Sequence, residues 1–558
     1  MEKFNDFKYI RPDVPAISKE LESLTKVLEE SKDYKSVSST VHEYFDITRH
    51  YETMGSLCSV RNSINTVDEF YEKETEFFNQ NGPVLQNSFN NYEKALVKSP
   101  FRKELEKEFG AYFFKKIETG LAVFDEKIVP DLIKENKLVT EYDKLIASAK
   151  ITYKGNVYNL SQMGKFTSNI DRAVRLEASK LVADFFEDNE SEFDRIYDEL
   201  VKVRDHQAKL MGYENYIEFA YKKLGRTDYT EEDVAKYRDQ IFESLVPVVS
   251  GIIKEQGKRI KIDNMQSYDL SLEFLDGNPT PKGSRESLVD KALAMYSEMS
   301  PETKEFFNLM VDRELMDLDS KAGKQGGGYC TEFPDYKVPF IFANFNGTKH
   351  DVDVLTHEAG HAFQSYESSK LIENPQMVFP TLEACEIHSM SMEFFAYPWM
   401  ESFFKEDTEK YKFSHVRGAL TFIPYGATVD EFQHFVYKNP KATKEERKAY
   451  FRKLQLKYTP YIKYDDIPFM QKGARFFAQG HIFQVPFYYI DYTLAQVCAL
   501  QFYLASVKDR KEAWQRYIKL CRLGGSRPFL ELVSEAGLKN PFVPGTIKAI
   551  VEELKEIM

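Results

Sequence analysis

The segment Asp351-Val-Asp-Val-Leu-Thr-His357-Glu358-Ala-Gly-His361-Ala-Phe-Gln-Ser365 combines helical spacing with metal-binding side chains. Residues four apart share one face of a helix, so His357 and His361 can direct their imidazoles at one cation, with Glu358 beside them. Zinc in catalytic sites usually has three protein ligands and an open position for water, whose pKa it lowers to about 7. The segment therefore predicts a helix that carries two zinc ligands and a general base.

An ordinary amphipathic helix is the alternative interpretation of this segment. A chance His-Glu-x-x-His string is expected in roughly one chain in a hundred of this length, so the motif alone favours a metal. A β-prone stretch precedes it, and Asp351 or Asp353 can cap the start of the helix. These surroundings strengthen the prediction of a metal site.

The third ligand must come from another part of the chain. The stretch from Thr381 to Phe394 is predicted to be a helix and offers four candidates, which are Glu383, Glu386, His388 and Glu393. The residues alone do not choose among them, because a helical glutamate is more often a solvated surface charge.

Hydrolysis of an amide also needs donors for the negative charge that develops on the carbonyl oxygen. The richest supply is the stretch 480–496, which contains His481, Tyr488, Tyr489 and Tyr492. If this stretch is helical, Tyr488 and Tyr492 share a face and Tyr489 lies beside Tyr492. Aromatic residues at helical spacing more often belong to a core, so both interpretations stay open.

Most of the remaining sequence has the periodicity of helices. Apolar residues recur at steps of three and four in Ala16 to Ser31, and similar patterns occupy residues 37–54, 191–210, 234–253 and 285–318. Strand signals are few: a hairpin around Gly155-Asn156, and a small sheet from the β-prone residues 326–345. We predict a mostly α-helical fold with an N-terminal helical lobe at residues 1–190 and a catalytic domain at residues 191–558.

The composition limits the class of protein. The 558 residues are 29% charged and 42% hydrophobic, which excludes general disorder, and the net charge of −13 argues against binding nucleic acid. No stretch approaches the roughly 18 apolar residues of a membrane span, and the N-terminus does not read as a secretion signal. The five widely spaced cysteines lack any Cys-x-x-Cys pair, so we expect reduced thiols in a cytoplasmic protein.

These motifs resemble the thimet oligopeptidase and oligoendopeptidase F family of zinc metallopeptidases, and within it the bacterial oligoendopeptidases. In this family the third zinc ligand lies in a Glu-x-x-Ser segment about 25 residues after the second histidine. Glu386-Ile-His-Ser389 fits, since 386 − 361 = 25. The resemblance thus implies Glu386 as the third ligand, in place of Glu383 and His388. Glu393, seven residues further on the same face, can orient a ligand histidine.

The resemblance covers approximately Gly323 to Pro544 and implies a two-lobed helical body with a deep substrate channel. Family members also carry a Gly-His followed by tyrosines that donate to the substrate carbonyl. His481 and Tyr492 match those positions. Tyr489 is the candidate for a second substrate-facing tyrosine, with Tyr488 as the alternative.

Our hypothesis is therefore a zinc-dependent endopeptidase with one Zn²⁺ ion, which cuts internal bonds of short unstructured peptides through a zinc-bound water activated by Glu358. Helical zinc carboxypeptidases and dipeptidyl carboxypeptidases share the motif, but they need a cationic clamp for the terminal carboxylate of the substrate. A catalytically silent peptide-binding scaffold is a further alternative. It is disfavoured because structural zinc sites usually have four protein ligands and are rich in cysteine. We expect no nucleic-acid or membrane partner.

Overall fold

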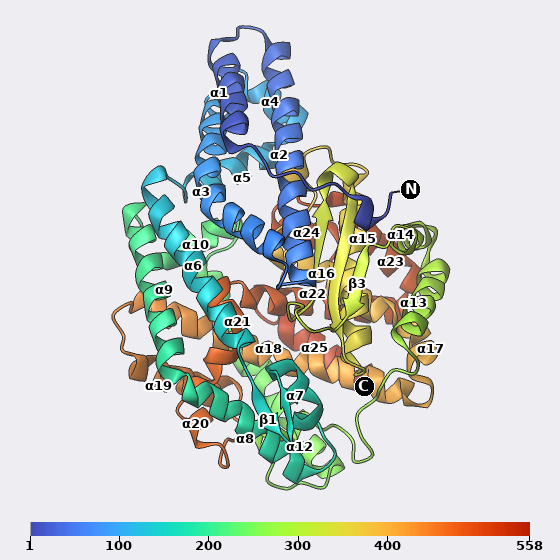
Figure 1. Ribbon diagram of the computed structural model, residues 1–558. Coiled ribbons are helices and arrows are strands. Elements are labelled where there is room, and N and C mark those ends of the chain that lie inside the picture. The colour runs from blue at the N-terminus through green and yellow to red at the C-terminus, as the bar shows by residue number, and fades with distance from the viewer. Residues whose placement is uncertain (1, 558) are drawn as a thin grey trace.

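Helices make up most of the structure, a computed structural model that describes residues 2–557 (Figure 1). The predicted mostly α-helical fold is confirmed. All five cysteines carry free thiols. No helix within residues 2–557 has both the length and the apolar composition that a membrane span requires. The cytoplasmic location stays a prediction.

The helices and strands have the following bounds. The helices of the first half are α1 (Val14–Glu30), α2 (Tyr34–Ile64), α3 (Glu69–Val97), α4 (Arg102–Phe109), α5 (Ala111–Leu121), α6 (Val129–Ala147), α7 (Leu160–Thr167), α8 (Arg172–Asp188), α9 (Glu190–Leu210), α10 (Tyr216–Lys223), α11 (Glu231–Gln240) and α12 (Val246–Arg259). Those of the second half are α13 (Arg285–Met299), α14 (Pro301–Asp312), α15 (His350–Ser369), α16 (Leu382–Phe395), α17 (Met400–Phe404), α18 (Thr408–Lys438), α19 (Lys444–Tyr458), α20 (Pro468–Gln471), α21 (Gly480–Gln484), α22 (Tyr489–Lys508), α23 (Arg510–Leu523), α24 (Phe529–Glu535) and α25 (Thr546–Ile557). The strands are β1 (Ile151–Tyr153), β2 (Asn156–Tyr158), β3 (Met316–Asp319), β4 (Tyr329–Phe333) and β5 (Val338–Phe345).

The first five helices share an apolar core, built from residues such as Leu21, Val41, Leu85 and Phe113 and joined by Met377 from the later part of the chain. In Figure 1 they project from the top of the molecule, and the lower part of α2 reaches the sheet in the body. There His50 bonds to Asp335 at 2.8 Å. The predicted division of the chain at residue 190 stays a prediction.

A three-stranded sheet supports the helix that carries the His-Glu-x-x-His motif. Its strand order is β3-β5-β4, with β5 parallel to β3 and antiparallel to β4. Residues 338–343 of β5 are all buried, which explains the unbroken apolar run there. The helix α15 follows β5 directly and packs against it. The predicted small sheet beside the motif helix is confirmed.

The second predicted strand pair, the β1–β2 hairpin, exists, but its turn lies one residue earlier than predicted. Lys154 and Gly155 form the turn with φ values of 48° and 80°, and Asn156 already pairs with Tyr153 in the ladder. Positive φ at both central residues is typical of the type I′ turns that join tight hairpins.

The long periodic stretch 285–318 is not one element. It contains α13, α14 and the strand β3. The break comes at Ser300, whose hydroxyl caps Thr303 of α14, followed by Pro301 in the first turn. Proline lacks an amide hydrogen and suits the start of a helix, so it begins α14 and cannot continue α13.

The predicted caps of the motif helix are wrong. The helix α15 begins at His350, and its N-cap, Lys349, makes no side-chain capping bond. Asp351 instead lies in the first turn, where its carboxylate accepts the backbone N–H groups of Asn346 and Gly347, both at 2.8 Å. The carboxylate therefore fixes the loop between β5 and α15.

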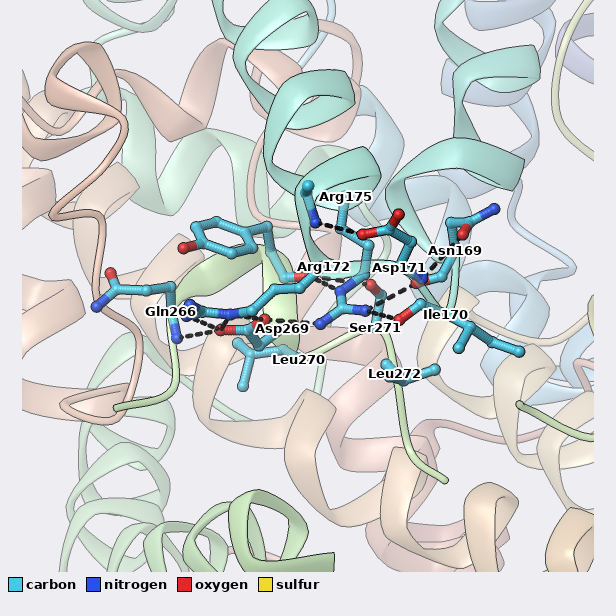
Figure 2. A network of polar contacts seen from close by, with 12 residues as sticks. Asn169, Ile170, Asp171, Arg172, Arg175, Gln266, Asp269, Leu270, Ser271 and Leu272 are labelled. Carbon is cyan, nitrogen blue, oxygen red and sulfur yellow. Dashed lines mark hydrogen bonds and ion pairs between the residues drawn. The ribbon is translucent and has the colours of Figure 1, made fainter. Parts of the chain in front are cut away.

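A buried ion-pair network ties α8 to the loop at residues 266–272 (Figure 2). Asp269 accepts from Arg175 and from Arg172, each at 2.8 Å, and from the backbone N–H of Gln266 at 3.0 Å. Arg175 also donates to the carbonyl of Tyr268 at 3.1 Å. Asp269 and Arg175 are completely buried, so each depends on the other for its charge.

We predict that Arg175→Met lowers the melting temperature by several degrees. The substitution leaves Asp269 buried with one partly exposed partner, and breaking a buried pair costs about 3–5 kcal/mol. Arg172→Met is the matched control: its side chain is 46% exposed, so its loss should cost less than about 1 kcal/mol. Calorimetry measures the melting temperature of both variants. An equal decrease in the two variants would contradict the proposed importance of the buried Arg175–Asp269 pair.

Candidate active site

The helices α15 and α16 cross at Gly360 with almost no space between their backbones. A Cβ atom at Gly360 would lie 2.6 Å from the Cα of Ser389 and 2.7 Å from the carbonyl oxygen of His388. Backbone atoms cannot move aside as the end of a flexible side chain can, so a larger residue would push the helices apart. This crossing brings the His357–His361 face of α15 against α16.

The donor atoms of His357, His361 and Glu386 converge at the crossing. All of them lie within 4.8 Å of one another. The Oε2 atom of Glu386 is 3.2 Å from Nε2 of His357 and 3.4 Å from Nε2 of His361. Burial by itself raises the pKa of Glu386, but the two imidazoles lower it well below its usual range, so the carboxylate is ionised. Two imidazoles and a carboxylate are a donor set typical of catalytic zinc.

The other predicted candidates on α16 lie elsewhere. Glu383 is buried near Arg226, and neither of its oxygens accepts a hydrogen bond from residues 2–557. His388 is completely buried, which lowers the pKa of its imidazole to about 4, so it is neutral. Neither residue joins the group formed by Glu386 and the two histidines.

Glu393 orients the first histidine of the motif. Its Oε1 lies 2.6 Å from Nδ1 of His357, and its Oε2 bonds to Nε2 of His415 on α18. Nδ1 of His415 in turn lies 2.7 Å from the hydroxyl of Tyr397. With Nδ1 of His357 occupied in this way, Nε2 faces the site. This is the orienting contact that the spacing of Glu393 predicts.

Glu358 lies beside the donors, with a buried oxygen that has no partner in the described part of the chain. Its side chain is buried, and Oε2 has no hydrogen-bond partner among residues 2–557. Burial raises the pKa of Glu358, and the charges of His357 and His361 only partly oppose this. A carboxylate with a raised pKa accepts a proton more readily near neutral pH than an ordinary one.

The predicted donor segment, residues 480–496, contacts the group formed by His357, His361 and Glu386. The hydroxyl of Tyr488 donates to Oε1 of Glu386 at 2.6 Å, and the hydroxyl of Tyr492 lies 3.2 Å from Nε2 of His481. Tyr489 instead packs edge-on against the rings of Tyr425 and Phe422. Of the two alternative tyrosines, Tyr488 contacts the carboxylate of the donor group and Tyr489 lies further along the wall.

A hydrogen-bonded chain fixes the tautomer of His481. The hydroxyl of Tyr425 donates to Oε1 of Gln479 at 3.0 Å, which leaves the amide NH₂ of Gln479 to donate to Nδ1 of His481 at 2.9 Å. Burial lowers the pKa of His481 to about 4, so the ring is neutral and carries its one proton on Nε2. That proton points toward Tyr492.

A cavity of about 440 Å³ adjoins these groups. The side chains that line it include Lys349, Asp353, His415, His481, Tyr489 and Tyr492. The cavity therefore opens beside the predicted donors and beside the residues that support the motif histidines.

Two family models match the chain. The peptidase M3 N-terminal domain matches residues 4–124, and peptidase family M3 matches residues 165–552. The chain belongs to peptidase family M3. The resemblance identified from the motifs is thus confirmed.

Relatives of this M3 peptidase agree with the assignment. It is 24% identical over 414 residues to an oligoendopeptidase F homolog of Borreliella burgdorferi, covering 70% of this chain and 67% of that protein. It is 21% identical over 538 residues to an oligoendopeptidase F homolog of Lactococcus lactis, covering 90% of this chain and 86% of that protein. The solved structure of PZ peptidase A with an inhibitor matches at 46% identity and a TM-score of 0.97, covering 100% of this chain and 99% of the other. The family and these relatives confirm the predicted enzyme class, a metalloendopeptidase.

Sequence reasoning missed the supporting residues His415, Gln479 and Tyr425. Each acts through a residue that the motifs did identify, and each lies on another element or in an irregular segment. None belongs to a motif with fixed spacing. Gln479, two residues before His481, was the only one whose position could have drawn attention.

We predict that Glu386→Ala lowers zinc retention far more than Glu383→Ala. The two variants are well matched, because both residues are buried glutamates three positions apart on α16, but only Glu386 lies against the motif histidines. If the three residues are the ligands, loss of one of them should weaken zinc affinity by several orders of magnitude. Zinc per chain after dialysis measures the effect, and equal loss in both variants would overturn the ligand assignment.

We also predict that Gln479→Leu lowers kcat about fivefold to tenfold with little change in KM, because Nδ1 of His481 loses the donor that fixes its tautomer. Gln484→Leu on α21 is the control, since that amide bonds to Asp143 instead. Steady-state kinetics on both variants decide the question. A normal kcat in Gln479→Leu would show that the tautomer is fixed by something else.

Proposed function

We propose that this M3 peptidase hydrolyses internal bonds of short, unstructured peptides with one zinc ion held by His357, His361 and Glu386. The observation that carries the proposal is the convergence of these three donors within 4.8 Å of one another, beside a buried carboxylate with a free oxygen. The printed names of the relatives, oligoendopeptidase F among them, support the choice of peptides as substrates.

The residues fit zinc in number and in chemistry. Two imidazoles and one carboxylate leave part of the coordination sphere to water and substrate, as catalytic zinc requires. A bound zinc ion would supply Lewis acidity, which lowers the pKa of water and polarises the substrate carbonyl. Glu393 supports this role because it holds Nδ1 of His357 and leaves Nε2 for the metal.

Glu358 is the proposed general base. Its free, buried oxygen can accept the proton of the attacking water and later deliver it to the leaving amine. The raised pKa of its carboxyl brings the group closer to the working pH, which makes both transfers easier.

Tyr492 is the proposed donor to the developing oxyanion, and His481 is proposed to position it. The proton on Nε2 of His481 is directed at the hydroxyl of Tyr492, which leaves the Tyr492 proton to donate to the substrate. Burial raises the pKa of Tyr492 above its usual value, so its hydroxyl keeps its proton. Tyr488 is proposed to hold Glu386 in place, because its hydroxyl donates to Oε1 of that residue, and Tyr489 is proposed to face the substrate from the cavity wall.

We predict that Glu358→Gln lowers turnover at least about a hundredfold while the protein keeps its full complement of zinc. The substrate is a quenched fluorescent peptide blocked at both ends, which only an endopeptidase cleaves. A chelator should abolish wild-type activity, and zinc should restore it. Normal turnover by a fully zinc-loaded variant would remove Glu358 from the mechanism, and wild-type activity that survives complete removal of metal would refute the proposed function.

A further inference from the structure

Arg475 has no protein partner for its charge. Every other arginine within residues 2–557 makes at least one hydrogen bond or ion pair with the protein, whereas the guanidinium of Arg475 makes none, and its Nη1 atom is buried without an acceptor. An arginine is always protonated, and the donors of a buried Nη1 that lack an acceptor are costly where water is excluded. Such a group is suited to an anion that arrives with a ligand.

The position of Arg475 links it to the proposed donor segment. It lies in the short 3₁₀ helix Ala474–Ala478, six residues before His481. Its guanidinium carbon is 5.6 Å from the centre of the Tyr425 ring, which is 5.8 Å from the ring of Tyr489. Tyr489 in turn is 5.1 Å from the ring of His481. The rings of Tyr425 and Tyr489 thus connect the guanidinium of Arg475 with His481. The side chain of Arg475 is partly exposed to solvent.

The surrounding chemistry selects a carboxylate. The Tyr425 face stabilises the cation, but it leaves the in-plane N–H groups free, and their fork geometry matches a carboxylate in two parallel hydrogen bonds. A carboxylate would therefore be favoured at Arg475.

Building on the proposed function, we propose that Arg475 forms a carboxylate-binding subsite for the peptide substrate. The carboxylate is either the C-terminal group, which every unblocked peptide carries, or an acidic side chain. The three ring distances set an upper limit on the separation, so at roughly 3.3 Å per residue of extended chain the subsite lies within about five residues of the position next to His481. It sets where a short peptide is cut by anchoring its charge at a fixed distance from the donor group.

The test uses one quenched peptide sequence in matched forms. In the first pair, one peptide ends in a free carboxylate and the other in an amide. In the second set every peptide ends in an amide, and each glutamine of the sequence is replaced in turn by glutamate. The zinc-loaded wild type should cleave the carboxylate form, or one of the glutamate forms, with about tenfold higher kcat/KM than its neutral partner, mainly through KM. A preference within the first pair identifies the C-terminal carboxylate as the ligand of Arg475, and a preference within the second set identifies an acidic side chain. Added salt should reduce the preference.

Three variants assign the preference to Arg475. In Arg475→Gln, kcat/KM for the charged peptide divided by kcat/KM for the neutral peptide should fall close to one. Arg475→Lys should keep part of this preference, because lysine retains the positive charge but lacks the paired N–H groups of the guanidinium. Arg259→Gln is the matched control and should keep the full ratio, since that guanidinium also lies on aromatic rings, Phe274 and Phe413, but outside the site.

The outcomes separate this subsite from the proposed function. If the wild type cleaves peptides with no preference for either kind of carboxylate, or if Arg475→Gln keeps the preference, the subsite is refuted and the peptidase activity stands. If no peptide is cleaved in any form, the proposed function itself fails. Because the readout is a ratio within one preparation, a partly unfolded variant does not imitate loss of the subsite, and Arg475→Lys provides a second variant if the glutamine form does not fold.

Discussion

The contact between α15 and α16 at Gly360 is the constraint on which the rest of the site depends. A Cβ atom there would overlap the backbone of Ser389 and His388, so the helices can approach this closely only because the residue is glycine. Their distance decides whether Glu386 reaches the motif histidines and whether Glu393 reaches Nδ1 of His357. A wider separation of the helices would move Glu386 away from Nε2 of His357 and Nε2 of His361 and so weaken a shared metal site.

A second close crossing sets the position of the donor segment. A Cβ atom at Gly426 on α18 would lie 2.1 Å from Cγ2 of Thr493 on α22. Just before α22, Phe487 has a φ of 67°, in the left-handed region that non-glycine residues rarely adopt. Its backbone N–H donates to Gln433 at 2.9 Å, and its carbonyl accepts from Arg226 at 2.7 Å. The strained turn is thus held on both sides, and the next residue, Tyr488 at the start of α22, places its hydroxyl on Glu386.

Several buried carboxylates of the site are ionised, and their negative charge favours a bound cation. Glu386, Glu393 and Asp353 all have pKa values below the usual range, despite burial, because imidazoles or Lys349 lie against them. Glu358, by contrast, has a raised pKa, and its Oε2 finds no hydrogen-bond partner among residues 2–557. The same packing therefore keeps Glu386, Glu393 and Asp353 ionised and leaves Glu358 ready to accept a proton.

The sequence by itself determined the helical class, the motif helix and the candidate residues on α16 and α22, because these depend on periodicity and on fixed spacing within one element. It did not determine the start of α15, the break at Pro301 or the turn of the hairpin, where local caps and backbone angles decide. Only the tertiary structure brought Glu386, and not Glu383 or His388, against the histidines, since which face of α16 meets α15 is a property of packing. It alone revealed His415, Gln479 and Arg475, because their roles come from neighbours distant in sequence: a hydrogen bond across helices leaves no spacing in the chain, and a missing counter-ion can be recognised only when every neighbour is in place.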